Sequence, residues 1–362
     1  MPAKTLRLLF LSTAVAITVA RGAEFETPSL PIATANNAIV TVIASDDRAY
    51  LISFAGLGAG KTVDDIHART FVLGLGDSRW REAPRVPGGV GRLAPVAVAL
   101  GSRAYVFGGY AVASDGSERS TPWVHAFDPV TDTFDALRAM PVPVDDAVAV
   151  TYQARYVYLI SGWHDDGNVN LVQRYDSHTD TWHQATPLPG PAVFGHAGGI
   201  VDNTIVYCDG VAVRAHRVRR RDFAASSACY VGSIDPENTR RIDWRRIDAH
   251  PGRPRYRMAA AGVPTLGAVV FTGGSTNPYN YDGVGYDGQA AQPATGTFYF
   301  DLRQRQWRSL PHDEAPPTMD HRGLVPWGGA WVTVGGMLAG QQVTDQVTSH
   351  RLPSTPPQLP NE

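Results

Sequence analysis

The sequence has little of several features that commonly reveal a function. Its Lys and Arg residues total 32 against 34 Asp and Glu, so it lacks the basic excess that is typical of nucleic-acid-binding proteins. No Ser-His-Asp order, phosphate-binding loop or zinc-ligand spacing stands out. We therefore expect no nucleic-acid partner, no bound metal and no other cofactor.

The chain also lacks an apolar run at its N-terminus that is long enough to span a bilayer. The stretch from Leu8 to Ala20 has 13 residues and follows Lys4 and Arg7. This is too short for a membrane-spanning helix and has the pattern of a secretory signal. We predict a signal peptide over residues 1–20 and a periplasmic or secreted mature protein that is free of the membrane. An uncleaved signal anchor is the alternative.

Only two cysteines are present, Cys208 and Cys229. The first ends a predicted strand and the second begins the next one, so the pairing of adjacent antiparallel strands would bring them together. Export to an oxidising compartment would allow a disulfide bond. The alternative is a pair of buried free thiols.

What the sequence does contain is a repeated phrase, in which an apolar run ends in Gly-Gly or a variant and is followed by aromatic residues. The clearest copies are Tyr105–Gly109 with Phe127 and Phe134, Val157–Gly162 with Tyr175 and Trp182, and Val269–Gly274 with Phe300 and Trp307. Weaker copies end at Gly56, Gly210 and Gly336. Copies that recur roughly every 40–60 residues in an all-strand chain are typical of propeller blades.

The repeat predicts an all-β, six-bladed β-propeller over residues 21–353, with a short tail over 354–362. Each blade would have four strands. Small apolar first strands are expected at 94–100, 147–152 and 259–263. In the last repeat we predict a third strand over 342–350 but find no fourth, and Phe25–Pro31 resembles Trp307–Pro311. We therefore predict that the N-terminal strand completes the last blade, which removes an open sheet edge.

These phrases resemble the kelch repeat, and the resemblance covers nearly all of the predicted mature chain. Within kelch proteins the chain is similar to bacterial periplasmic N-acetylneuraminate mutarotases (sialic acid epimerases). The similar stretches are Ser29–Leu51, Val86–Gly89, Leu324–Trp327 leading to Gly335-Gly336, and Val343–Asp345. The resemblance implies an isomerase that acts on an acidic or acetylated sugar. It also implies an acid and an arginine after the fourth-blade glycine, where this chain has Val211, with Asp209 and Arg214 nearby.

Residues just before each first strand would ring the mouth of the central channel. Arginine binds carboxylates through a two-pronged fork, and His and Asp exchange protons when their pKa values are suitable. We predict as catalytic residues Asp146, His196 and His321. We predict as substrate-binding residues Arg92, Trp163, Arg214, Tyr256, Arg257, Tyr281 and Arg322. Alternatively these charged side chains cap turns or face solvent, and Asp146 and Arg257 pair with one another.

Other functions remain open. The same loops would suit a non-catalytic periplasmic module that binds a glycan or a partner protein. The basic run His216–Arg221 is either an anion or partner patch or a solvated insertion. A copper oxidase of the galactose oxidase type is a minor alternative, but it requires a Tyr–Cys crosslink and two histidines on copper.

Overall fold

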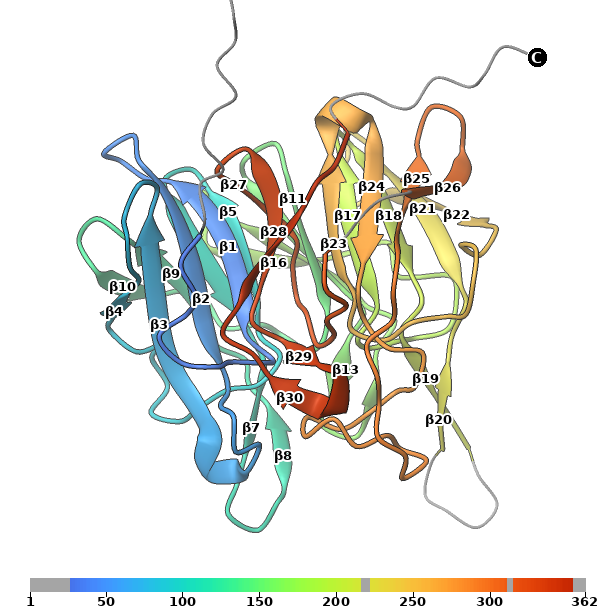
Figure 1. Cartoon of the computed structure of the whole chain (residues 1–362). Coiled ribbons are helices and arrows are strands. Elements are labelled where there is room, and N and C mark those ends of the chain that lie inside the picture. The colour runs from blue at the N-terminus through green and yellow to red at the C-terminus, as the bar shows by residue number, and fades with distance from the viewer. Residues whose placement is uncertain (1–26, 216–221, 311–314, 354–362) are drawn as a thin grey trace, which may run out of the picture.

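The computed structural model describes residues 27–215, 222–310 and 315–353 (Figure 1). The predicted signal peptide, the basic run His216–Arg221 and the predicted tail lie outside these residues. Helix is limited to three short 3₁₀ turns in this part of the chain, η1 (Val63–Asp65), η2 (Pro264–Leu266) and η3 (Ala339–Gln341). None of its helices is long and apolar enough to cross a membrane.

Six antiparallel sheets follow one another along the chain and form the blades of a β-propeller. The first three are β1 (Ala38–Ile43), β2 (Ala49–Leu57), β3 (Ile66–Gly74) and β4 (Arg81–Ala83), then β5 (Val96–Leu100), β6 (Arg103–Phe107), β9 (Val124–Asp128) and β10 (Thr133–Ala136), then β11 (Val148–Tyr152), β12 (Tyr156–Ile160), β15 (Val172–Asp176) and β16 (Thr181–Ala185). The next two are β17 (Ala197–Val201), β18 (Thr204–Cys208), β21 (Cys229–Ile234) and β22 (Ile242–Ile247), then β23 (Ala259–Val263), β24 (Ala268–Thr272), β25 (Thr297–Asp301) and β26 (Gln306–Leu310). The sixth has β27 (Val325–Trp327), β28 (Ala330–Val334) and β31 (Val347–His350). The six-bladed all-β prediction is confirmed.

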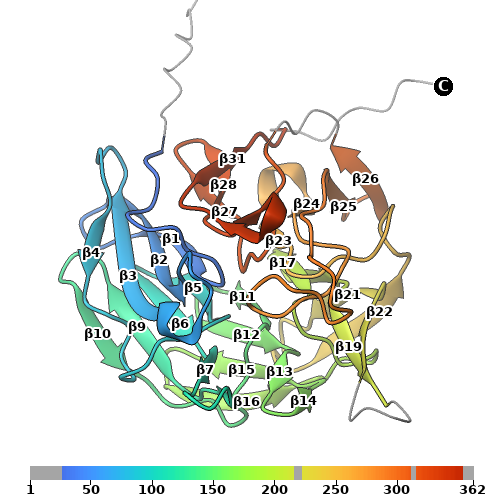
Figure 2. The same cartoon turned by 60° about the horizontal axis from the view of Figure 1, so that its bottom comes forward.

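The connections between the second and third strands of four blades form small two-stranded ribbons. They are β7 (Tyr110–Val112) with β8 (Glu118–Ser120), β13 (Trp163–His164) with β14 (Gly167–Asn168), β19 (Val211–Arg214) with β20 (Asp222–Ala225), and β29 (Met337–Leu338) with β30 (Gln342–Val343). All lie on the lower face in Figure 1, which Figure 2 turns toward the viewer. The strand predicted over 342–350 is therefore broken, because residues 342–343 pair with β29 instead of continuing into β31.

Tryptophans of the fourth strands join neighbouring blades. The indole Nε1 of Trp182 donates to Arg138 O at 2.9 Å, that of Trp244 to Thr186 O at 3.1 Å and that of Trp307 to Asp248 O at 2.7 Å. Each acceptor follows the fourth strand of the preceding blade, so the bond ties one blade to the next.

The same bond links the first blade to the N-terminal segment. Trp80 Nε1 donates to Pro28 O at 2.7 Å, and Leu30 N–H donates to Asp345 O at 2.8 Å, just before β31. Pro28 thus takes the place that follows a fourth strand, and the first and last blades lie side by side (Figure 2). Residues 27–31 are not themselves a strand, and Phe25 and Glu26 lie outside the described residues.

The predicted disulfide is present. Cys208 on β18 and Cys229 on β21 are direct cross-strand partners with Cα atoms 4.2 Å apart, and their sulfurs are bonded. Both cysteines of the sequence are therefore used in the bond, and neither is available for the Tyr–Cys crosslink that the copper oxidase alternative requires.

We expect reduction of this disulfide to lower the free energy of unfolding by roughly 3 kcal/mol, because the bond closes a short loop in the unfolded chain. Its residues are 21 apart in sequence. Denaturant unfolding with and without a thiol reductant measures the change. The double variant Cys208→Ser/Cys229→Ser is the control, since its stability should not respond to the reductant. An equal response in that variant would contradict the prediction.

Candidate functional site

A ring of six residues in left-handed backbone conformation closes the propeller axis on the ribbon face. One residue comes from each blade, with φ between 48° and 73°: Asn36, Ala94, Asp146, Gly195, Arg257 and Asp320. The amide of each of the next four donates to the carbonyl of the one before it, at 2.7–3.2 Å. His321 N–H continues the chain to Arg257 O at 3.2 Å. Non-glycine residues adopt this conformation rarely, so their occurrence in every blade but one marks a built feature.

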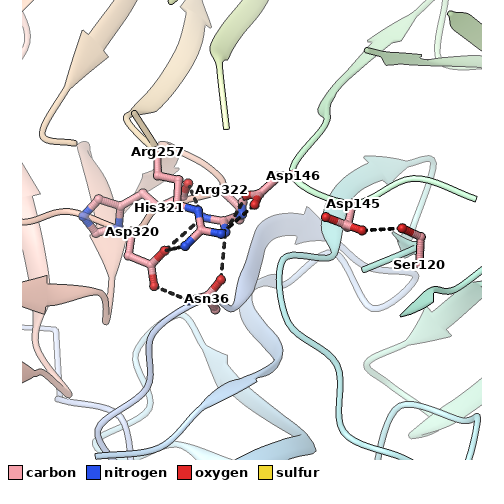
Figure 3. Close-up of polar contacts among 8 residues, drawn as sticks. All are labelled: Asn36, Ser120, Asp145, Asp146, Arg257, Asp320, His321 and Arg322. Atoms are coloured by element: carbon pink, nitrogen blue, oxygen red, sulfur yellow. Dashed lines mark hydrogen bonds and ion pairs between the residues drawn. The ribbon is translucent and has the colours of Figure 1, made fainter. Parts of the chain in front are cut away.

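Polar side chains at this ring meet in a buried group, which we call the floor cluster (Figure 3). Its members are Asn36, Asp146, Arg257, Asp320 and the neighbouring Arg322. Arg257 bonds Asp146 Oδ2 at 2.6 Å and Asp320 Oδ1 at 3.2 Å. Arg322 bonds Asp146 Oδ1 at 2.6 Å and Asp320 Oδ1 at 3.4 Å, and it donates to Asn36 Oδ1 at 2.8 Å. Asn36 in turn donates to Asp320 Oδ2 at 2.5 Å. The cluster thus joins the third, fifth, sixth and first blades across the axis.

The electrostatics of the floor cluster favour the ionised forms. Burial by itself raises the pKa of Asp146, but the charges of Arg257 and Arg322 outweigh it and hold that pKa below its ordinary value. The pKa of Arg257 is raised well above its usual range, since Asp146 and Asp320 offset the effect of burial. The Arg257 guanidinium also lies 4.7 Å from the Tyr256 ring centre and 5.3 Å from that of Tyr279. The alternative in which Asp146 and Arg257 pair with one another is the arrangement observed.

The floor cluster separates two cavities. On the ribbon face lies a cavity of about 280 Å³, the mouth pocket, lined by Tyr110, Glu118, Asp145, Asp146, Trp163, Phe194, Phe223, Arg257, Asn280, Tyr281 and Tyr286. On the other side lies the axial cavity of about 310 Å³, lined by the small residues of the inner strands β1, β5, β11, β17, β23 and β27. Asp146 lines both cavities.

Aromatic rings make up most of the mouth pocket wall. Trp163 lies 5.1 Å from Phe194 between ring centres, and Phe223 stacks on Tyr286 at 4.1 Å. Such surfaces suit the apolar face of a sugar ring, while the carboxyl, hydroxyl and amide groups at the base and rim can bond its hydroxyls.

Asp145 is the exception in a repeated position. In every blade the residue before the ring residue forms a β-bridge to the ribbon side, and in the other five blades that residue is apolar: Ala35, Leu93, Phe194, Tyr256 and Met319. Asp145 is 3% exposed. Burial, and next the negative charge of Asp146, raise its pKa well above the ordinary value. The surroundings of Asp145 thus favour the protonated form of its carboxyl group, whereas those of Asp146 favour the ionised form.

A hydrogen bond from Ser120 holds the Asp145 carboxyl group in place. Ser120 Oγ donates to Asp145 Oδ2 at 2.6 Å and accepts the N–H of Asp165 at 3.1 Å (Figure 3 shows the first bond). Ser120 Oγ also lies 3.4 Å from Trp163 O. Two ribbons, β7–β8 and β13–β14, thus hold the carboxyl group in place.

The structure divides the predicted site residues between the two cavities. Four of them line the mouth pocket: Asp146, Trp163, Arg257 and Tyr281. His196, His321 and Arg322 line the axial cavity with Asp146. Burial lowers the pKa of His196 to about 4 and that of His321 to about 3. Both imidazoles are therefore neutral near pH 7.

Three predicted residues line neither cavity. Arg92 is fully buried, donates to Gly108 O at 3.0 Å and lies 5.5 Å from the Trp123 ring centre, and burial lowers its pKa to about 10. Tyr256 packs beneath Arg257 and edge-on to Phe194 at 5.4 Å. Arg214 is exposed at the end of β19.

Sequence reasoning did not single out Tyr110, Glu118 or Phe223, and it placed Asp145 at the mouth of the channel without a catalytic or binding role. For Asp145 a signal was present, because alignment of the six repeats at their first strands sets one carboxylate against five apolar residues. Tyr110, Glu118 and Phe223 come from ribbons whose lengths differ between blades, so no repeat pattern marks them. In the described ranges no three His, Cys, Asp or Glu side chains are grouped to hold a metal ion.

Comparison with known proteins gives partial matches in sequence. The kelch motif model matches residues 91–141. Kelch-like protein 15 of Gallus gallus is 29% identical over 131 residues, which is 36% of this chain and 25% of that protein. Kelch-like protein terF of Aspergillus terreus is 25% identical over 174 residues, 48% of this chain and 34% of that protein. The chain thus spans about a quarter to a third of the length of these relatives.

A solved structure matches over a larger part of the chain. The structure of YjhT superposes with a TM-score of 0.68 at 16% identity, over 89% of this chain and 96% of the other. At that identity the likeness concerns the fold alone. The sequence match and the strand order together show that the chain carries a kelch motif and folds as a six-bladed β-propeller.

Proposed function

We propose that this propeller is an exported sugar isomerase of the mutarotase type, which binds one acidic or acetylated monosaccharide in the mouth pocket. The observation that carries the proposal is the pair Asp145 and Asp146. These adjacent carboxyl groups line one aromatic pocket, and their surroundings shift their pKa values in opposite directions. Paired groups with separated pKa values are a common arrangement for acid–base catalysis.

The reaction requires little beyond proton transfer at the anomeric carbon. To open the ring, the ring oxygen must gain a proton and the anomeric hydroxyl must lose one. Asp145, whose surroundings favour the protonated form, lies at the base of the pocket beside the charged Asp146. Trp163 and Phe194 would stack against the sugar ring, and Asn280 would bond its hydroxyls or acetamido group. A pocket of about 280 Å³ suits a single sugar unit.

Two sequence features support the remaining parts of the proposal. The short phrases shared with N-acetylneuraminate mutarotases favour that reaction class. The N-terminal pattern favours export, and the Cys208–Cys229 disulfide is compatible with an oxidising compartment. The predicted role of Arg257 in binding a substrate carboxylate is opposed by the structure of the floor cluster, because Asp146 and Asp320 already bind its guanidinium.

Proton NMR of freshly dissolved α-anomeric N-acetylneuraminate tests the proposal, with neutral N-acetylmannosamine as a second probe. We expect the protein to speed equilibration of the anomers and the Trp163→Ala variant to weaken sugar binding. Asp282→Asn, in the loop that carries Tyr281, is the matched control and should behave as the parent. Line broadening without faster equilibration would indicate a non-catalytic binding module. The absence of both effects with both probes would overturn the sugar site.

A further inference from the structure

We propose that one carboxyl group, that of Asp145, both donates and accepts the proton when the bound sugar opens. The inference rests on the proposed isomerase function and names the group that performs its chemistry. It assigns Asp146 a different role, which is to form part of the charged base of the pocket. Four observations about these two side chains lead to it.

Asp146 is a poor proton acceptor. Its Oδ2 accepts a hydrogen bond from Arg257 at 2.6 Å, and its Oδ1 lies 2.6 Å from the guanidinium of Arg322 in an ion pair without hydrogen-bond geometry. Its side chain is 2% exposed, and the two arginines keep it ionised. Protonation of Asp146 would weaken both ion pairs and leave buried positive charge without its full partner.

Asp145 has both functions that the reaction needs. It lines the mouth pocket, it lies among apolar side chains and it has no arginine partner within ion-pair distance in the described chain. A neutral carboxyl group carries one O–H donor and one carbonyl acceptor. Its two oxygens sit on one carbon, as do the ring oxygen and hydroxyl oxygen of the sugar. The two pairs of oxygens therefore match in spacing.

Ser120 sets which oxygen performs which step. Ser120 Oγ accepts the Asp165 amide and has two acceptors for its own proton, Asp145 Oδ2 at 2.6 Å and Trp163 O at 3.4 Å; we place the proton on the shorter contact, to Oδ2. Oδ2 is thus the accepting oxygen and the acid proton resides on Oδ1. After transfer the proton is on Oδ2, and Ser120 can then turn its hydroxyl toward Trp163 O, 3.4 Å away, and accept from Asp145.

The proposed step balances without another reactant. The Oδ1 proton moves to the ring oxygen as the bond between that oxygen and the anomeric carbon breaks. The anomeric hydroxyl proton moves to Oδ2 as the carbonyl forms. Asp145 is neutral before and after, and nothing is oxidised or reduced. Rotation of the carbonyl and the reverse transfer then close the ring to the other anomer.

Several groups face Asp145 and set the pH range of this chemistry. Asp146 precedes β11 with it, Glu118 and Ser120 come from β8, and Arg257 precedes β23. Glu118 and Asp146 favour the protonated form, whereas Ser120 and Arg257 oppose it. Because the pKa of Asp145 is raised, activity should be full at lower pH and fall as the pH rises through that value. No loss should accompany protonation of Asp146.

The test compares the pH–rate profiles of the parent and of Arg322→Gln. Arg322 binds Asp146 but lies on the axial side and does not line the mouth pocket. Its loss should raise the pKa of Asp146, because one of the two positive charges that lower it is removed. We expect both profiles to stay level on the acidic side and to fall together on the alkaline side.

A second measurement needs no variant and stands if Arg322→Gln fails to fold. Carbon-13 NMR of the aspartate carboxyl groups in the parent follows the titration of each residue. We expect the midpoint of activity loss to coincide with titration of Asp145. An acidic limb that shifts upward in Arg322→Gln, or a rate that follows the titration of Asp146, would overturn the inference and leave the isomerase standing. A parent protein that speeds no probe sugar would overturn the proposed function, and this inference with it.

Discussion

Replacement of Arg257 by leucine is expected to destabilise the propeller by about 3–5 kcal/mol, the range found when one partner of a buried ion pair is removed. The Arg257 side chain is 3% exposed and binds two aspartates that are 2% and 0% exposed. Without it, Asp146 and Asp320 share only Arg322. The base of the pocket would then carry an uncompensated buried negative charge that leucine cannot offset.

The matched control makes the same substitution at an exposed pair. Arg245 bonds Asp243 at 2.8 Å, with side chains 69% and 58% exposed. Solvent-exposed pairs contribute about 1 kcal/mol or less, so Arg245→Leu should change stability little. Urea unfolding of both variants and the parent measures the difference. A loss below about 1 kcal/mol in Arg257→Leu would show that the floor cluster contributes no more than a surface pair.

The blade architecture was predictable because each blade repeats the same physical requirements. A first strand of small residues, a glycine after the second strand and a fourth-strand tryptophan recur, and each has a fixed place in the sheet. Trp182, Trp244 and Trp307 each donate to the blade before. The predicted first strand 259–263 has the observed bounds, and the predicted strands 94–100 and 147–152 begin one or two residues early.

The candidate site was predictable only in part. The sequence places Asp146, Arg257 and Arg322 at the starts of blades, but it does not show that left-handed backbone turns bring them together. Aspartate adopts that conformation more readily than most residues, so Asp146 has some local preference for it, but Arg257 has none. The hydrogen bonds from blade to blade stabilise it. These hydrogen bonds form only when the six blades close into a ring, so no local sequence pattern predicts them.

The left-handed turns also explain why His196 and His321 line the axial cavity and not the mouth pocket. Both follow a ring residue directly, at Gly195 and Asp320, so in sequence they are indistinguishable from pocket residues. The turn at the ring residue sends the following side chain to the axial side, where both histidines line the cavity. A role for them in the mouth pocket chemistry would require contact through the floor cluster.

Asp145→Asn should reduce sugar isomerisation by about a hundredfold to ten-thousandfold, the range for loss of a general acid or base. Asparagine fills the same space and can keep the Ser120 bond, but its amide cannot give up a proton as a carboxyl group does. The free energy of unfolding of this variant should not fall with its activity. The pKa of Asp145 is higher in the folded chain than in the unfolded one. Its contribution to stability is therefore full below the unfolded value and is lost as the pH rises toward the folded value.

Asparagine does not ionise, so Asp145→Asn should be at least as stable as the parent at neutral pH, and its advantage should shrink as the pH falls toward the ordinary aspartate value of 3.8. Thermal melts across pH, run beside the NMR rate assay, measure both effects on one sample. Asp282→Asn should change neither the rate nor the melting temperature. A variant that loses activity only because it unfolds would melt lower than the parent at neutral pH, and that result would remove Asp145 as the reacting group. Loss of rate together with retained or raised stability would be the signature of a buried acid held neutral for catalysis.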